Sequence, residues 1–142
     1  MQLSNSMRAA MFSTALMNAV GAYALSPMGA ALRDLGGLPK AEHPFFLVTL
    51  SLFVLLFGFA YFWVGWSARV DRLFLCVAAV GKLCFFGSIT FYALLGHLPS
   101  RAILPGGGDL FFGSLFLFWL YRDHTSKDIP QANKTQTPRK NR

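Results

Sequence analysis

Charged residues are sparse along the chain and divide it into long apolar stretches. Arg8 and Arg33 enclose 24 uncharged residues, and residues 44–68 form a second uncharged stretch of 25. The third stretch, 73–98, contains one Lys or Arg residue, Lys82. A helix needs about 20 residues to cross roughly 30 Å of hydrocarbon. Each of these stretches is therefore long enough to be a transmembrane helix.

The fourth stretch lies between Arg101 and Arg122, and it begins differently from the others. It contains a Pro-Gly-Gly-Gly sequence that ends at Gly108 and is followed by Asp109. Proline and glycine disfavour a helix interior, so we expect a loop that becomes helical near Gly108. The helix from there to Tyr121 would be only ~20 Å long. It would have to be a short span, or one preceded by a re-entrant turn buried against protein.

This pattern predicts an all-α fold, an integral membrane four-helix bundle formed by residues 1–125. The polar segment 126–142 has five basic residues and no aromatic residue. It cannot bury enough apolar surface to become ordered, so we expect a disordered basic tail. The predicted spans are about 9–32, 45–67, 73–97 and 104–121.

The first stretch allows a second interpretation. Arg8, the apolar run after it and the Ala-Tyr-Ala sequence at 22–24 together resemble a secretory signal peptide with its cleavage site. However, Asn18 interrupts the run, and apolar residues continue as far as Leu32. These features favour a retained helix, and a cleaved first segment is the alternative.

Composition narrows the class of protein. The chain is 54% hydrophobic and 13% charged, whereas a soluble domain carries about 25% charged residues. This excludes an ordinary soluble enzyme, a nucleic-acid-binding module and a secreted disulfide scaffold. The expected partners are the lipid bilayer and other membrane proteins, with no nucleic acid.

The basic residues also predict an orientation. With four spans both termini lie on the same side, and that side collects nine Lys and Arg residues against three on the other. The positive-inside rule then places both termini in the cytoplasm. We expect a multi-pass protein of the cell inner (plasma) membrane. The nine are Arg8, Arg69, Arg72, Arg122 and the five of the tail, and the three are Arg33, Lys40 and Arg101.

Lys82 lies deep in the third span. An ionisable group there costs at least ~2.5–3.5 kcal/mol, so it normally faces the protein interior and has a partner. Counted from Arg72 and Arg122, Lys82 is ~15 Å deep and Asp109 ~20 Å deep, within reach of a flexible lysine side chain. We expect an ion pair that either locks two helices together or serves as a functional proton or anion site. The remaining alternative is an unpaired Lys82 whose side chain extends outward.

Asn18 is the third deep polar residue. It lies ~15 Å into the first span, at the depth expected for Lys82. A lone asparagine in a membrane usually forms an interhelical hydrogen bond worth ~0.6–2 kcal/mol. We therefore take Lys82, Asp109 and Asn18 as a candidate buried polar centre. The second span carries a matching stripe of small residues at a seven-residue spacing, namely Ser51, Gly58 and Gly65.

Other residues with metal-binding or redox chemistry carry weaker signals. His43 and His97 are expected at the same outer level, with Glu42 adjacent, and such groups can bind a transition metal. Histidines at helix ends are more often interfacial polar residues, so we expect no metal and no cofactor. Cys76 and Cys84 are ~12 Å apart along one helix, too far for a disulfide. We expect both to be buried reduced thiols.

The sequence contains none of the common catalytic motifs of hydrolases, nucleotide-binding proteins or metalloproteases. We therefore expect a non-enzymatic protein, either a structural or an accessory subunit that acts through helix contacts. The alternative is a small transporter-like protein that uses the buried Lys82, Asp109 and Asn18. A membrane enzyme or a quinone-associated redox protein is a third class without a supporting motif. A water-accessible cavity that reaches Lys82 and Asp109 would favour transport, and a dry pair would favour the structural role.

Several short motifs carry a family resemblance across residues 8–122. In size and layout, the chain resembles a group of small four-helix bacterial inner-membrane proteins, mostly uncharacterised and DoxX-like. The resemblance implies a four-helix membrane fold and brings no activity with it. The motifs are Asn18 with Gly-Ala at 21–22 and Pro27, Gly-Phe-Ala-Tyr at 58–61, Gly81-Lys82, and Gly-Asp-Leu at 108–110.

Overall fold

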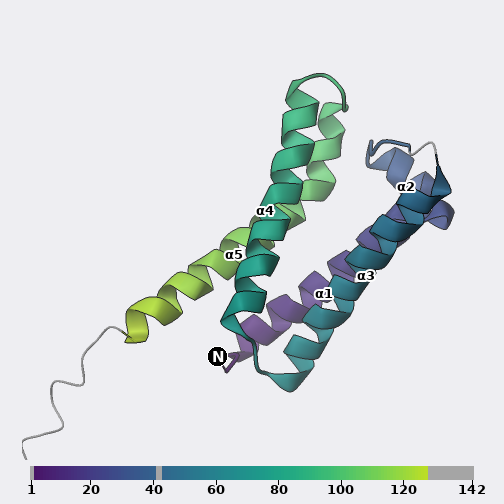
Figure 1. Ribbon diagram of the computed structural model, residues 1–142. Helices are drawn as coiled ribbons and strands as arrows, with labels where there is room; N and C mark the ends of the chain where they lie inside the picture. Colours follow the sequence, from purple (N-terminus) through teal and green to yellow (C-terminus); the bar gives the residue numbers. More distant parts are fainter. Residues whose placement is uncertain (1, 41–42, 128–142) are drawn as a thin grey trace, which may run out of the picture.

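The computed structural model describes residues 2–40 and 43–127, and the described residues form helices and no strand. Three of the helices are long and apolar enough to cross a membrane, and a fourth candidate span consists of two helices joined by a sharp bend. The fold is therefore all-α, as predicted, and suited to a membrane. The predicted tail lies outside the described residues from residue 128 onward. In order, the helices are α1 (Asn5–Leu25), α2 (Ala30–Leu35), α3 (Pro44–Ser67), α4 (Arg72–Leu94) and α5 (Ile103–Lys127) (Figure 1).

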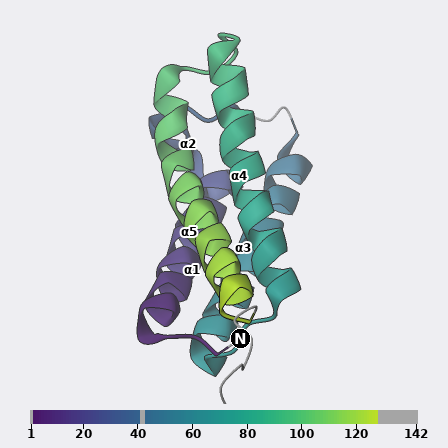
Figure 2. The same ribbon diagram turned by 90° about the vertical axis from the view of Figure 1, so that its left-hand side faces the viewer.

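The long helices associate in two antiparallel pairs, α1 with α3 and α4 with α5 (Figures 1 and 2). Helix α1 also approaches α5, but no close backbone contact joins α3 to α4 among the described residues. A short connection at 68–71 links α3 to α4, with Ala68 in the left-handed conformation (φ 55°). The two pairs meet at this lower end of the molecule and diverge toward the upper end (Figure 1).

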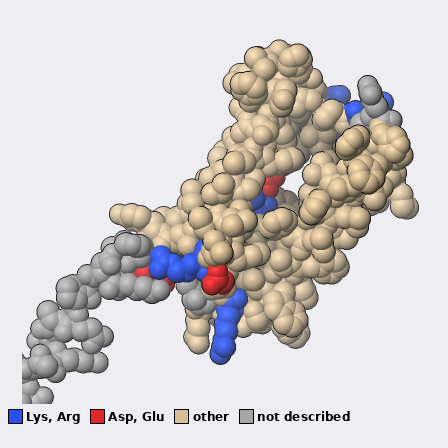
Figure 3. Space-filling view, viewed as in Figure 1, with Lys and Arg blue, Asp and Glu red and all other residues tan. Residues whose placement is uncertain are grey.

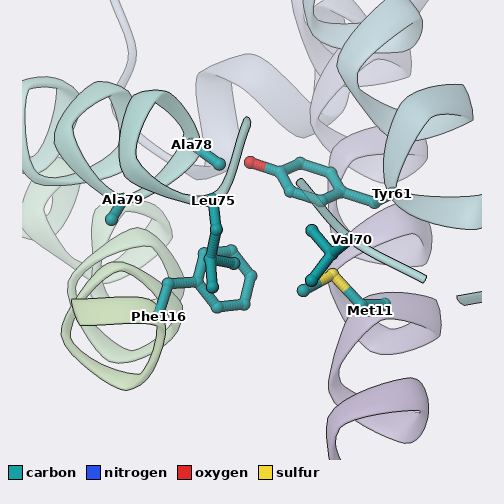
Figure 4. Close-up of a cluster of buried hydrophobic side chains, with 7 residues drawn as sticks. All are labelled: Met11, Tyr61, Val70, Leu75, Ala78, Ala79 and Phe116. Carbon is teal, nitrogen blue, oxygen red and sulfur yellow. The ribbon is translucent and has the colours of Figure 1, made fainter. Parts of the chain in front are cut away.

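A cluster of buried apolar side chains lies near the lower end, where the two pairs meet (Figure 4). Phe116 of α5 and Tyr61 of α3 are its largest members, and Met11 of α1 completes the contact between the pairs. Many large apolar side chains outside this cluster are exposed, as expected when lipid replaces water. The buried cluster consists of Met11, Tyr61, Val70, Leu75, Ala78, Ala79 and Phe116.

Small residues set the close approach within each pair. A Cβ atom at Gly58 of α3 would lie 3.3 Å from the Asn18 Cβ of α1. A Cβ atom at Gly113 of α5 would lie 2.9 Å from Leu83 Cγ of α4. Helices in lipid associate through such close packing, because there is no hydrophobic force to bring them together. The stripe of small residues predicted on the second span therefore does face α1.

The first predicted span, 9–32, is not one continuous helix. Helix α1 ends at Leu25, and the chain bends by 85° into a 3₁₀ turn (Pro27–Gly29) and then α2. Proline has no N–H for the helix ladder and its ring clashes with the preceding turn, which explains the break. Gly29 then packs directly against the backbone of Tyr23, where no side chain would fit.

Arg33 holds this bend. The residue is only 6% exposed, and its Nη1 donates to the carbonyls of Ala24 at 3.4 Å and Ser26 at 3.1 Å. The last carbonyls of a helix have no partner within the helix, and a guanidinium group satisfies them well. The segment that starts at Arg33 therefore begins inside a short helix, with the charge of Arg33 buried.

The fourth span also differs from the prediction. Helix α5 begins at Ile103, well before Gly108, and continues through the three glycines. Pro105 lies in the first turn, where its missing N–H costs little. A Cβ atom at Gly106 would lie 3.2 Å from Phe86 Cδ2, so glycine permits close packing on α4. The segment is a full-length helix, about 37 Å long, and no re-entrant loop is needed.

The expectation that the two cysteines are buried is wrong. Cys76 and Cys84 are both free thiols, as expected, but both are exposed on α4. An apolar residue of a membrane helix can face lipid as readily as protein, so hydrophobic surroundings in the sequence do not imply burial.

Candidate functional site

Lys82 of α4 and Asp109 of α5 form an ion pair. Lys82 Nζ lies 2.6 Å from Asp109 Oδ1, and the two side chains are 6% and 16% exposed. Gly113, one turn beyond Asp109, allows α5 to approach α4 closely. The pair therefore sits at the contact between two tightly packed helices.

Asn18 of α1 joins the pair from the other side of the molecule. Lys82 Nζ donates to Asn18 Oδ1 at 3.2 Å, and Asn18 Nδ2 donates to the Val54 carbonyl of α3 at 3.2 Å. Asn18 thus uses both ends of its amide to connect the α1–α3 pair with the α4–α5 pair. The structure brings together all three residues that the sequence proposed as a polar centre.

Tyr61 is a further member of the centre. Lys82 Nζ lies 5.4 Å from the centroid of its ring, within cation–π range. The side chain is 2% exposed and also packs on Phe74 and Phe116. Sequence reasoning did not assign Tyr61 to the centre. Its position three residues after Gly58, on the face that meets α1, was the available signal.

These residues lie at the bottom of a cleft between the two helix pairs. The cleft has a volume of about 710 Å³, and its walls are mainly apolar. Figure 3 shows positive and negative side-chain atoms inside this hollow. The polar groups among the lining residues are Asn18, Tyr61, Lys82, Arg101 and Asp109.

The upper end of the cleft is crossed by the chain that follows α2. A Cβ atom at Gly36 would lie 3.2 Å from Pro105 Cγ, and one at Gly37 would lie 2.8 Å from Pro99 Cγ. Gly37 has a positive φ of 69°, which glycine adopts without strain. This segment and the start of α5 therefore close the cleft toward the upper surface, and the buried cluster of Figure 4 closes it below.

The sides of the cleft differ from each other. On one side Gly108 of α5 packs against Met17 of α1. On the other side α3 and α4 make no close backbone contact in the part of the chain that is described. The edges of this gap carry exposed lining residues, among them Phe53 and Phe57 of α3 and Phe85 of α4. The cleft therefore opens laterally, between α3 and α4.

His43 and His97 make separate local contacts in the described part of the chain. His43 caps α3, and its Nδ1 accepts a hydrogen bond from the Phe45 backbone N–H at 3.2 Å. His97 packs against the Tyr92 ring, and Glu42 lies outside the described residues. Within 2–40 and 43–127 no group of three or more His, Cys, Asp or Glu side chains could hold a metal ion.

No protein-family model, curated protein or solved structure matches the chain. The resemblance to DoxX-like proteins therefore stays a prediction.

Proposed function

We propose that this chain is a small transporter-like membrane protein that binds a lipid-soluble molecule with one polar end. The molecule enters the cleft between the helix pairs, and its polar end meets Lys82, Asp109 and Asn18. The observation that carries this proposal is the cleft itself, because it reaches the ion pair. An apolar cavity with a few convergent polar groups is the usual form of a small-molecule site, and about 300–1,000 Å³ is its usual size.

The direction of the opening supports a ligand that comes from the bilayer. Lys82 lies ten residues after Arg72, ~15 Å along the helix, which is half of the roughly 30 Å hydrocarbon thickness. The cleft opens sideways at this depth and is crossed by protein at its upper end. A solute dissolved in lipid reaches such an opening directly, whereas an aqueous solute would have to leave water first.

The proposal includes a membrane arrangement. The chain forms a four-helix bundle in the cell inner membrane, with α1 as the first crossing, α2 near the outer surface, and both termini in the cytoplasm. The excess of basic residues on the terminal side supports this orientation. Trp63 and Trp66 support it too, because both are exposed near the end of α3 on that side, where an aromatic belt is expected.

A structural or accessory role, with no enzymatic activity, was the first expectation from the sequence. Such a role predicts a polar pair sealed between helices, and Asp109 instead lines the cleft. This contact with an open cavity is the reason to place binding and transport first. In an accessory role, a helix of another membrane protein would bind in the gap between α3 and α4.

The test uses a photoreactive ligand and two matched leucine variants. The probe is hexadecanol with a diazirine at the chain end, added to the full chain in lipid nanodiscs, and labelled residues are identified by mass spectrometry. Gly81 lines the cleft and Gly87 does not, although both lie on α4. A Cβ atom at either position meets no described atom within 4 Å, so Gly81→Leu and Gly87→Leu should both fold.

We expect saturable labelling of cleft residues in the unmodified protein and in Gly87→Leu. In Gly81→Leu the new side chain occupies the cleft, so labelling should fall to the non-saturable background. Labelling of the outer helix faces as strong as that of the cleft would overturn the proposal. Equally strong cleft labelling in Gly81→Leu and Gly87→Leu would overturn it too. Protection of the cleft by a co-purified membrane subunit would instead support the accessory role.

A further inference from the structure

We infer that the polar end of the ligand is an uncharged hydroxyl group. The inference rests on the proposed function, and it assigns a chemical class to the molecule held in the cleft: a long-chain, isoprenoid or glycerol-based alcohol. It follows from the charge and the hydrogen-bonding capacity at the base of the cleft, and from the depth of the polar centre in the membrane.

The charges at the base already balance. Lys82 and Asp109 contribute one positive and one negative charge, 2.6 Å apart. A carboxylate ligand would be attracted by Lys82 but would meet Asp109 at close range, and an ammonium ligand would have the reverse problem. Burying a charge without a partner in a low-dielectric site is strongly unfavourable. A neutral polar end avoids this cost.

The donors at the base are largely used, and acceptors remain. Lys82 Nζ donates to Asn18 Oδ1 and Asp109 Oδ1 and lies over the Tyr61 ring. Asn18 Nδ2 donates to the Val54 carbonyl. Asp109 Oδ2 accepts no hydrogen bond from the described residues, although the side chain lines the cleft. A ligand group that donates a hydrogen bond to this carboxylate oxygen would therefore fit the base of the cleft.

Tyr61 provides a second contact that suits a hydroxyl group. Its side chain lines the cleft, and its Oη forms no hydrogen bond with any described residue. Figure 4 shows this oxygen directed toward α4, next to Ala78 of the buried cluster. A phenol group can both donate and accept. A ligand hydroxyl that donates to Asp109 can therefore accept from Tyr61, whereas an ether can only accept.

The experiment compares four competitors of identical chain length against the hexadecanol photoprobe. They are hexadecanol, hexadecyl methyl ether, hexadecanoate and hexadecylamine, each added to the full chain in nanodiscs. We expect hexadecanol to compete best. The ether should be weaker by about 10- to 100-fold, the usual effect of one hydrogen bond to a charged group. The two charged compounds should be weaker than hexadecanol at a pH where each is ionised.

A double variant provides the matched control. Lys82→Met with Asp109→Leu removes the carboxylate that accepts from the ligand hydroxyl while leaving no unpaired charge. The cleft, Asn18 and Tyr61 remain, so the advantage of the alcohol over the ether should shrink markedly. Competition by the ether, the acid or the amine as strong as that by the alcohol would overturn the inference and leave the proposed function standing. Failure of the photoprobe to label the cleft saturably would overturn the proposed function itself. If the double variant kept the full preference for the alcohol, the hydroxyl group would not donate to Asp109 and the inference would also fall.

Discussion

At the scale of single residues, Lys82 makes the polar contacts that join the four long helices inside the protein. Its ammonium group contacts Asp109, Asn18 and Tyr61, which come from three other helices. An ammonium group in the middle of a membrane is tolerated only when such contacts replace its hydration. Each contact is modest, but together they fix how four long helices meet around one point.

The first prediction concerns the ion pair. Lys82→Met or Asp109→Leu alone leaves one charge unpaired in a buried site, which typically costs ~3–5 kcal/mol, a large share of the stability of a small protein. Each single variant should therefore unfold at a lower temperature and give less folded protein in mild detergent. The double variant should recover much of the loss, because two apolar side chains need no partner.

The outcome also separates a structural pair from a functional one. If the double variant recovers stability but binds no hydroxyl ligand, the pair serves binding. Two single variants as stable as the unmodified protein would show that the pair contributes nothing, and the description of the interior would then fail.

At the scale of helices, the contact between α4 and α5 depends on missing side chains. A Cβ atom at Gly113 would lie 2.9 Å from Leu83 Cγ and 3.2 Å from the Ala79 carbonyl oxygen. That approach places Asp109, one turn earlier on α5, against Lys82 of α4. A Cβ atom at Gly107, on the same helix, would have no neighbouring described atom within 4 Å apart from the adjacent backbone of α5.

The second prediction compares these two glycines. Gly113→Leu should push α4 and α5 apart, at a cost of about 1–3 kcal/mol for overpacking, and should also weaken the Lys82–Asp109 contact. Gly107→Leu should leave stability unchanged or slightly raised, because leucine is the better helix former. Thermal unfolding in detergent measures both. Equal destabilisation by the two substitutions would indicate an effect of helix propensity or lipid contact rather than of packing between α4 and α5.

At the scale of the whole molecule, the polar centre was more predictable than the cleft. The depth of Lys82, Asp109 and Asn18 follows from a constant rise of ~1.5 Å per residue, so their meeting could be derived from the sequence. The cleft could not, because Phe57, which lines it, and Phe59, which does not, have the same apolar character. Hydrophobic pattern separates membrane from water, but in lipid it does not separate an outer face from a cavity wall.

The helix boundaries, too, could be predicted from the sequence only in part. Pro27 gave a visible signal for the break after α1, but a proline in a membrane helix can also be accommodated by a kink. The bend of 85° depends on tertiary contacts, namely the carbonyls that Arg33 caps and the packing of Gly29 on α1. In α5 local propensity pointed to a loop, but glycine at positions 106 and 108 permits the contacts with Phe86 and Met17 that the helix makes.

The last prediction concerns the orientation of the whole chain in the membrane. A reporter fused after Arg122 should lie in the cytoplasm, and reporters fused near Gly37 or Ser100 should lie outside, because the terminal side carries nine basic residues against three. The measurement is alkaline phosphatase activity for external fusions and green fluorescence for cytoplasmic ones. The fusion near Gly37 tests the first crossing directly, since α1 qualifies as a span only together with the helix beyond its bend. The Ser100 fusion is its control, because Ser100 follows α4 and lies far beyond the bend. An external C-terminus would mean three crossings or a cleaved first segment, and either would remove α1 and Asn18 from the wall of the proposed cleft.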